Sequence, residues 1–262
     1  MTRIYTLVNQ KGGVGKTTTA INLGAYLAQM SQRVLVVDLD PQANATSSLG
    51  VDKRAVQGST YEALLNGDVP AASILYNDRL QLSLLPSSPS LAGAEIELVD
   101  ELGREFRLKK ALASLDGKYD YILIDCPPSL GILTVNGLVA ARDGVLVPVQ
   151  CEYLALEGLG QLTQTIERVQ SALFPELSVR GVILTMFDPR TNLSNDVVKE
   201  VKNHFPGQVF QSIVPRSIRL AEAPSYGLPI SSYSPSSVGA HAYEALAKEL
   251  LKGDGIKTKD ER

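Results

Sequence analysis

The residues with the clearest chemical potential form a glycine-rich segment near the start of the chain, Gln10-Lys11-Gly12-Gly13-Val14-Gly15-Lys16-Thr17-Thr18. Its second half fits the phosphate-binding pattern G-x-x-x-x-G-K-[ST], although Gln10 stands where that pattern has its first glycine. Glycines let backbone N–H groups approach phosphate oxygens, and a helix that starts near Thr17 directs the positive end of its dipole there. We therefore predict that Lys16 binds nucleotide phosphates, that Thr17 binds Mg²⁺ and that Thr18 contacts the α-phosphate.

Lys11 is a second lysine on the same loop. It could fold inward onto the phosphates, project across an interface, or be a solvated loop residue, and spacing alone leaves these alternatives open. The whole segment could also be an ordinary glycine-rich turn. The succession of strand, loop, Gly-Lys-Thr and helix argues against that alternative.

Acidic residues follow two apolar segments of strand type. Val34–Val37 leads into Asp38 and Asp40, which alternation places on one side of the strand end. They could order the Mg²⁺ shell and an attacking water, or they could simply form a turn. Tyr121–Ile124 leads into Asp125, and an apolar strand that ends in one Asp is the Walker B pattern. We predict Asp38 and Asp125 near Mg²⁺, reaching it through water.

The elements that must position these residues alternate along the chain. Short apolar segments predict strands at Ile4–Val8, Val34–Val37, Leu80–Leu85, Tyr121–Ile124, Gly144–Val149, Val179–Leu184 and Val209–Ile213. Helices are predicted at Thr17–Met30, Leu91–Leu115, Leu133–Ala141, Leu156–Leu173, Asn195–Phe205 and Gly239–Leu251. This order predicts an α/β fold: a single doubly wound, mostly parallel sheet with helices on both faces and ligands at the carboxyl ends of its strands. We expect one domain, 1–252, and a flexible polar tail, 253–262.

Composition limits the function classes. The 262 residues are 44% hydrophobic and 20% charged, which is typical of a globular chain, and the net charge of −3 argues against a generally basic nucleic-acid binder. Two cysteines and two histidines cannot form a disulfide framework or a multi-histidine metal centre. Neither a signal peptide nor a membrane-spanning segment is predicted, so we expect a cytoplasmic protein.

Several motifs carry a family resemblance. KGGVGKTT (11–18), VDLDPQAN (37–44) and ILIDCPPSLG (122–131) together resemble the ParA/Soj-type chromosome- and plasmid-partitioning ATPases, which have a deviant Walker A loop. Agreement continues in VQCEY (149–153), LEGL (156–159), TMFD (185–188), VPRSIRL (214–220) and EAPS (222–225). The match runs from about Thr2 to Leu251.

The resemblance implies roles in ATP hydrolysis. Lys11 matches the signature lysine that reaches the phosphates of the opposite subunit in an ATP-sandwich homodimer, so Lys11, Lys16 and Asp40 are the expected catalytic residues. Asp40 matches the acid that positions the attacking water. Pro215 and Ser217 match positions that line the adenine, and Met186 is assigned to nucleotide binding with them. Ser217 is often Asn in relatives.

The resemblance also implies partners. Family members bind double-stranded DNA non-specifically as ATP dimers on the nucleoid, and a ParB-type centromere-binding protein stimulates their hydrolysis. Arg190 and Arg219 match arginines implicated in DNA binding, and Lys199, Lys202 and Lys248 are added as candidates. Leu228 stands where many relatives have Lys, which removes one charge from the expected patch.

Other functions predict other features. A MinD-like membrane ATPase needs an amphipathic C-terminal helix, whereas this chain ends in the polar GDGIKTKDER. A nitrogenase-type reductase or cluster carrier needs paired cysteines, and Cys126 and Cys151 stand in unsuitable contexts. A GTPase needs [NT]-K-x-D, whereas Thr185–Asp188 lacks the lysine. A scaffold with an inactive site is disfavoured because the loop lysine, threonine and acids are all present.

Overall fold

The computed structural model describes residues 1–152 and 155–257, and for 155–158 the backbone alone. The strands are β1 (Arg3–Leu7), β2 (Val34–Asp38), β3 (Leu75–Asn77), β4 (Leu82–Leu85), β5 (Tyr121–Asp125), β6 (Gly144–Gln150) and β7 (Val179–Thr185). The α-helices are α1 (Lys16–Gln29), α2 (Asn44–Ser48), α3 (Thr60–Asn66), α4 (Leu91–Glu97), α5 (Arg107–Ala113), α6 (Ile132–Ala140), α7 (Ala155–Ala172), α8 (Asn192–His204), α9 (Ile218–Glu222), α10 (Ile230–Tyr233) and α11 (Val238–Gly253). Short 3-10 helices are η1 (Ala71–Ser73), η2 (Arg104–Phe106) and η3 (Ala223–Tyr226). Tyr153 of the quoted motif and the end of the expected tail, 258–262, lie outside the described residues.

The described strands form one sheet in the order β3-β4-β2-β5-β1-β6-β7. All neighbouring pairs are parallel except β3 with β4. The glycine-rich loop follows β1, Asp40 follows β2, and the Walker B segment is β5. These three strands are neighbours in the sheet, with β5 between β1 and β2. Their register pairs Asp125 with Leu7 on one side and with Asp38 on the other. The predicted doubly wound, mostly parallel sheet is confirmed.

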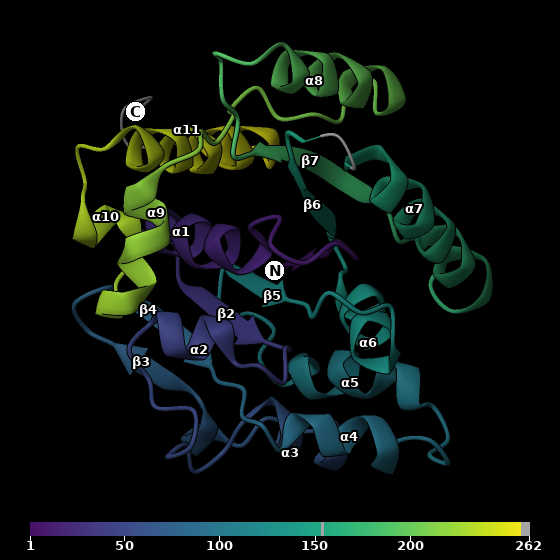
Figure 1. Cartoon of the computed structure of the whole chain (residues 1–262). Coiled ribbons are helices and arrows are strands. Elements are labelled where there is room, and N and C mark those ends of the chain that lie inside the picture. The colour runs from purple at the N-terminus through teal and green to yellow at the C-terminus, as the bar shows by residue number, and fades with distance from the viewer. Residues whose placement is uncertain (153–154, 258–262) are drawn as a thin grey trace.

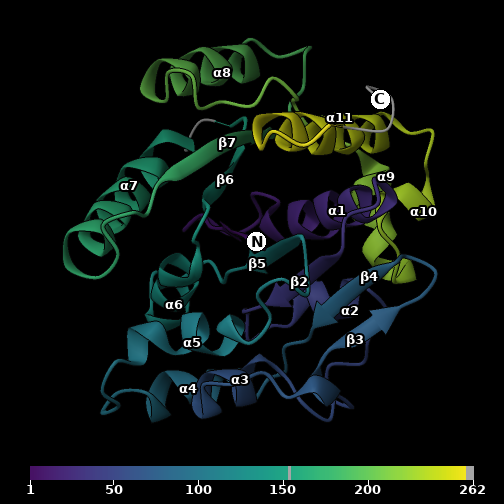
Figure 2. The same ribbon diagram turned by 180° about the vertical axis from the view of Figure 1, so that it is seen from behind.

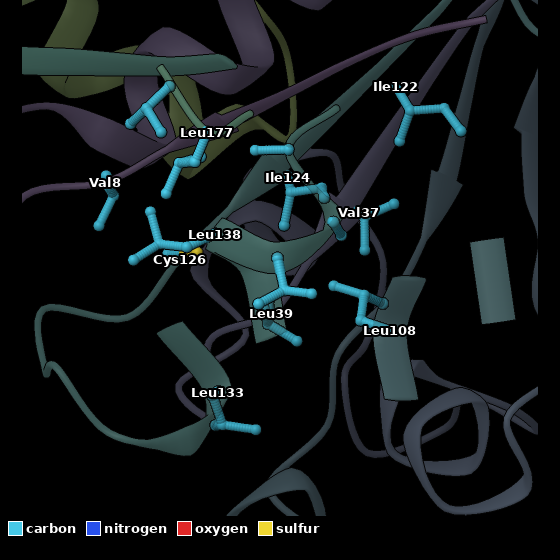
Figure 3. Packing of buried hydrophobic residues seen from close by; sticks show 14 of the residues in the cluster. Val8, Val37, Leu39, Leu108, Ile122, Ile124, Cys126, Leu133, Leu138 and Leu177 are labelled. Atoms are coloured by element: carbon cyan, nitrogen blue, oxygen red, sulfur yellow. The ribbon is translucent and has the colours of Figure 1, made fainter. Parts of the chain in front are cut away.

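Helices cover both faces of the sheet (Figures 1 and 2). Side chains of β2 and β5 alternate between two cores: Val37 and Ile124 pack with α3, α5 and α6, whereas Val36 and Leu123 pack with α1 and α11. Cys126, just beyond β5, lies near Leu138 in the first core (Figure 3). Burial on both faces explains why these strands read as continuous apolar segments.

The predicted strand at Val209–Ile213 was wrong. The segment runs beside β7, but only an isolated bridge between Val182 and Val209 forms. The Phe210 and Val214 N–H groups donate to β7 carbonyls at 3.0 and 2.9 Å, but between them the N–H groups of Gln211 and Ser212 donate to the Glu249 carboxylate of α11, at 2.7 and 2.9 Å. A side chain from a distant helix therefore interrupts the ladder.

The predicted long helix at Leu91–Leu115 is also broken. It divides into α4, η2 and α5, and Gly103 between them has φ 68°, in the left-handed region that favours glycine. The Arg104 guanidinium donates to the Val99 carbonyl, an acceptor that a continuous helix would use for its own backbone.

The sequence predicts a flexible tail from residue 253, but the structure places residues 253 and 254 within the domain. Asp254 closes α11, and its side chain is only 2% exposed. It accepts hydrogen bonds from the Tyr5 and Tyr121 hydroxyls, both at 2.8 Å, and from the Arg180 guanidinium at 3.1 Å. Arg3 donates to the Asp254 carbonyl at 2.6 Å. The beginning of the expected tail is therefore part of the domain.

Candidate nucleotide-binding site

The glycine-rich loop joins the end of β1 to the start of α1. Gly13 and Gly15 have φ values of 76° and 90°, which residues with a Cβ rarely adopt, and Gly15 caps α1. Thr185, the last residue of β7, donates its hydroxyl to the Val14 carbonyl at 2.8 Å. The loop is therefore anchored to the sheet while its glycines leave the backbone open for a phosphate.

The two loop lysines have different surroundings. Lys16 is 7% exposed, and its ammonium donates to the Lys11 carbonyl at 3.4 Å. Burial lowers the pKa of Lys16, and the nearby Asp125 carboxylate opposes that effect. Lys11 is half-buried, and its backbone N–H donates to Asn9 Oδ1 at 3.0 Å. The Lys16 charge therefore lies near the buried acids, and its binding to nucleotide phosphates stays a prediction.

Asp125 and Thr17 form the clearest candidate Mg²⁺ site. Thr17 Oγ1 donates to Asp125 Oδ2 at 2.6 Å, while Asp125 Oδ1 is buried and has no hydrogen-bond partner among the described residues. Burial, followed by the charge of Asp38, raises the pKa of Asp125 well above its usual value. A divalent cation would remove that penalty, and Mg²⁺ is commonly held by few protein oxygens together with water. The residues fit the ion.

Asp38 and Asp40 are held by backbone and side-chain donors. Asp38 is fully buried, and burial raises its pKa to about 6 against the opposing effect of hydrogen bonds from Thr46. The Asp40 backbone N–H donates to Asp38 Oδ1 at 3.2 Å, and the Gln42 backbone N–H donates to Asp40 Oδ1 at 2.9 Å. Ala43, which follows, has φ 53°, an uncommon conformation for a non-glycine residue. This segment is therefore tightly constrained beside Lys16 and Asp125.

A cavity of about 400 Å³ adjoins the loop. Its walls are Gly15, Thr18, Thr185, Met186, Val214, Pro215, Arg216, Ser217, Ile218, Leu220, Ala221 and Tyr243. The predicted nucleotide residues Met186, Pro215 and Ser217 thus meet loop residues in one largely apolar hollow. A planar base fits such a lining, with its phosphates directed toward the loop.

The predicted DNA-binding residues lie on the loop after β7 and on α8, α9 and α11. Four of the five are ion-paired: Arg190 with Asp188 at 2.7 Å, Lys199 with Asp196 at 4.0 Å, Arg219 with Glu222 at 2.9 Å and Lys248 with Glu244 at 3.0 Å. Lys202 is exposed on α8. Four of these five cations therefore face an acidic neighbour within this chain.

Sequence reasoning missed several positioning residues. Asn9 receives the Lys11 N–H and donates to the Pro148 carbonyl at 2.7 Å, which ties the loop to β6. Arg216 lines the cavity and pairs with Glu152 at 2.5 Å. Asn9 directly before the glycine-rich segment was a possible signal, whereas the Arg216 pair joins residues 64 positions apart and had none.

Comparisons with known proteins agree with this geometry. The model of a family described as an AAA domain matches residues 2–179. The chain is 54% identical over 257 residues to the chromosome partitioning protein ParA of Myxococcus xanthus, covering 98% of this chain and 90% of that protein. It is 52% identical over 254 residues to the sporulation initiation inhibitor protein Soj of Bacillus subtilis, covering 95% and 98%.

A solved structure is similar over the whole fold. A crystal structure named as cobyrinic acid a,c-diamide synthase from Mycobacterium smegmatis, with bound ADP and magnesium, has a TM-score of 0.85 and 43% identity over 98% of both chains. In the part of this chain that the structure describes, no helix is long and apolar enough to cross a membrane. From its loop, its acids and its full-length relatives, the chain belongs to the ParA/Soj family of chromosome-partitioning ATPases.

Proposed function

We propose that this protein is a nucleotide-driven dimerisation switch for chromosome or plasmid partitioning. It binds ATP with Mg²⁺, forms an ATP-sandwich homodimer, binds double-stranded DNA without sequence preference, and is reset by hydrolysis that a ParB-type partner stimulates. One observation carries the nucleotide part: the loop that presents Lys16 adjoins the apolar cavity and also the Asp125 oxygen that has no hydrogen-bond partner within the described part of the chain.

The chain's own groups divide the work of hydrolysis. The loop N–H groups and Lys16 hold the phosphates, Thr17 and Asp125 hold the Mg²⁺, with Asp38 behind them, and the cavity holds the adenine. Mg²⁺ supplies charge neutralisation at the phosphates when bound. Asp40 orients the attacking water, and Lys11 of one subunit neutralises charge at the phosphates of the other.

We expect DNA binding because a dimer carries two copies of the local group of cations that includes Arg190 and Arg219. The chain as a whole is acidic, so a monomer should bind DNA poorly. Arg190, Arg219 and their neighbouring lysines occur twice in a dimer, and each phosphate contact adds through counterion release. Contacts to phosphates carry no base information, so binding should be independent of sequence.

The test is retardation of random-sequence DNA with ATP, with ADP and without nucleotide. We expect retardation with ATP alone, and strong weakening as salt rises. Arg219→Glu should abolish it and leave ATP-dependent dimerisation measurable by light scattering. Arg79→Glu is the matched control, because Arg79 is exposed between β3 and β4, at the other edge of the sheet from β7. An Arg219→Glu dimer that still binds DNA with the parent's salt dependence would contradict the patch.

The name of the solved relative suggests amide synthesis as a second function. An amide synthase that works through a covalent intermediate needs an accessible nucleophile, such as a thiolate. Cys126 and Cys151 are both buried, and burial raises the pKa of each thiol. Nothing at the described site therefore favours that activity.

A further inference from the structure

Thr46 joins three segments at the carboxyl edge of the sheet. Its hydroxyl donates to Asp38 Oδ2 at 2.7 Å, and its backbone N–H donates to the same oxygen at 2.8 Å. The Ser87 backbone N–H, just beyond β4, donates to Thr46 Oγ1 at 2.9 Å. Thr46 is fully buried, so these partners rather than water satisfy the hydroxyl. One side chain on α2 therefore connects the ends of β2 and β4.

The contact reaches Asp40 through Asp38. Thr46 fixes one oxygen of the Asp38 carboxylate, and the other oxygen receives the backbone N–H of Asp40 at 3.2 Å. A rotation of the buried carboxylate would release that N–H, and with it the turn that carries Asp40. The Ser87 N–H holds the Thr46 hydroxyl next to the end of β4. The hydrogen bonds from Thr46 to Asp38 and from Asp40 to Asp38 are therefore anchored to the sheet.

The same contact separates the roles of the two cross-strand acids. Asp38 and Asp125 are register partners on β2 and β5. Both oxygens of Asp38 accept hydrogen bonds from the protein, whereas Asp125 keeps Oδ1 without a partner among the described residues. The donors from Thr46 hold Asp38 toward α2, and this leaves the Asp125 oxygen as the open position for the metal ion.

We propose that Thr46 is a positioning residue for ATP hydrolysis. It acts through Asp38, by fixing the turn from which Asp40 orients the attacking water. The proposal rests on the role of Asp40 put forward above. Thr46 is not among the residues that line the nucleotide cavity, so its loss should affect turnover more than nucleotide binding.

The test replaces Thr46 by Val, which keeps the branched shape and removes the hydroxyl. We expect kcat to fall about 10- to 100-fold, the range for residues that orient a metal site's ligands from behind. KM for ATP and the affinity for a fluorescent ADP analogue should change less than about threefold, because the phosphate loop is untouched. Thr46→Ser keeps the hydroxyl and should restore most of kcat. Thr46→Ala repeats the test if the Val variant does not fold.

Thr6→Val is the matched control. Thr6 is also fully buried, and its hydroxyl donates to the Gly137 carbonyl at 2.6 Å rather than to one of the acids. It should lower thermal stability comparably and leave kcat unchanged. Equal kcat in Thr46→Val and Thr6→Val would overturn the proposal.

Asp40→Ala is measured in parallel to separate the two claims. Normal hydrolysis by Asp40→Ala would overturn the role of Asp40 and the proposal for Thr46 together. An inactive Asp40→Ala beside an unimpaired Thr46→Val would overturn the proposal for Thr46 alone.

Discussion

Single residues at the ends of β2 and β5 differ in what surrounds their carboxylates. Asp125 shares a hydrogen bond with Thr17 and keeps one buried oxygen open. Asp38 has both oxygens occupied by protein donors. Among the described residues, Asp40 accepts one hydrogen bond, from the Gln42 N–H. It is 6% exposed whereas Asp38 and Asp125 are fully buried, so its carboxylate is the most accessible of the three to a water molecule.

This difference predicts a trapped state for Asp40→Ala. The substitution removes the group that orients water and leaves Lys16, Thr17 and Asp125 in place. ATP hydrolysis should fall while the ATP-bound dimer accumulates, because the general-base contribution is lost and the phosphate contacts remain. Light scattering with ATP measures the dimer and phosphate release measures hydrolysis. A variant that stays monomeric and hydrolyses ATP would contradict the assignment.

The two thiols should be inert in the folded protein. Burial raises the pKa of Cys151 to about 12, and burial together with the Asp125 charge raises the pKa of Cys126 further still. Reaction requires the thiolate and access to it, so a charged disulfide reagent at pH 8 should label neither residue until guanidinium unfolds the chain. Rapid labelling of the native protein would show that the region around β5 or β6 opens.

At the level of elements, the sequence predicted those strands and helices that depend on interactions between residues close together in the chain. Continuous apolar segments identified β2 and β5, and Gly15-Lys16-Thr17 located the start of α1. The predicted strand at Val209–Ile213 failed because Glu249, almost 40 positions later, takes its backbone donors. The Thr46 contact with Ser87 joins residues 41 positions apart and leaves no periodic signal.

The end of α11 is the element whose role the sequence hid most completely. GDG followed by charged residues is typical of a frayed tail, yet Asp254 meets partners up to 251 positions away. Asp254→Ala would leave the Arg180 guanidinium and two tyrosine hydroxyls without their shared acceptor, whereas the hydrogen bond from Arg3 to the backbone carbonyl would remain. Leaving buried donors without their acceptor costs about 1–3 kcal/mol.

Chemical denaturation checks this prediction. The free energy of unfolding should fall by that amount in Asp254→Ala and by less in Asp254→Asn, which keeps one acceptor oxygen. Lys257→Ala is the control, because Lys257 is exposed three residues further along. Equal unfolding midpoints for Asp254→Ala and Lys257→Ala would contradict the anchoring role.

At the level of the whole molecule, the phosphate loop lies at the carboxyl end of the central strand β1, where its exposed part can meet a second copy. Gly12 and Gly13 are exposed beside the half-buried Lys11. A lysine that completes the site of a partner should matter for association more than for binding by the monomer.

Lys11→Ala tests that expectation. ATP-dependent dimerisation should weaken markedly, because two like-charged phosphate groups would face each other without the crossing lysines. The affinity of the monomer for ATP should change much less, since Lys16 and the loop N–H groups remain. Light scattering with ATP measures dimerisation, and equilibrium nucleotide binding measures the affinity of the monomer for ATP. Unimpaired dimerisation would contradict a role for Lys11 at the interface and would favour the alternative that it is a solvated loop residue.

The anchoring of Asp254 also bears on when the domain can close during synthesis, because its partners lie far earlier in the chain. A growing chain makes the phosphate loop first, but Tyr5 and Tyr121 must wait for the acceptor that arrives near the end. Until Asp254 leaves the ribosome, the amino ends of β1 and β5 hold polar groups without their final partner, and α11 cannot cover α1. We therefore expect a chain shortened before α11 to leave α1 uncovered and to be less stable than the full domain.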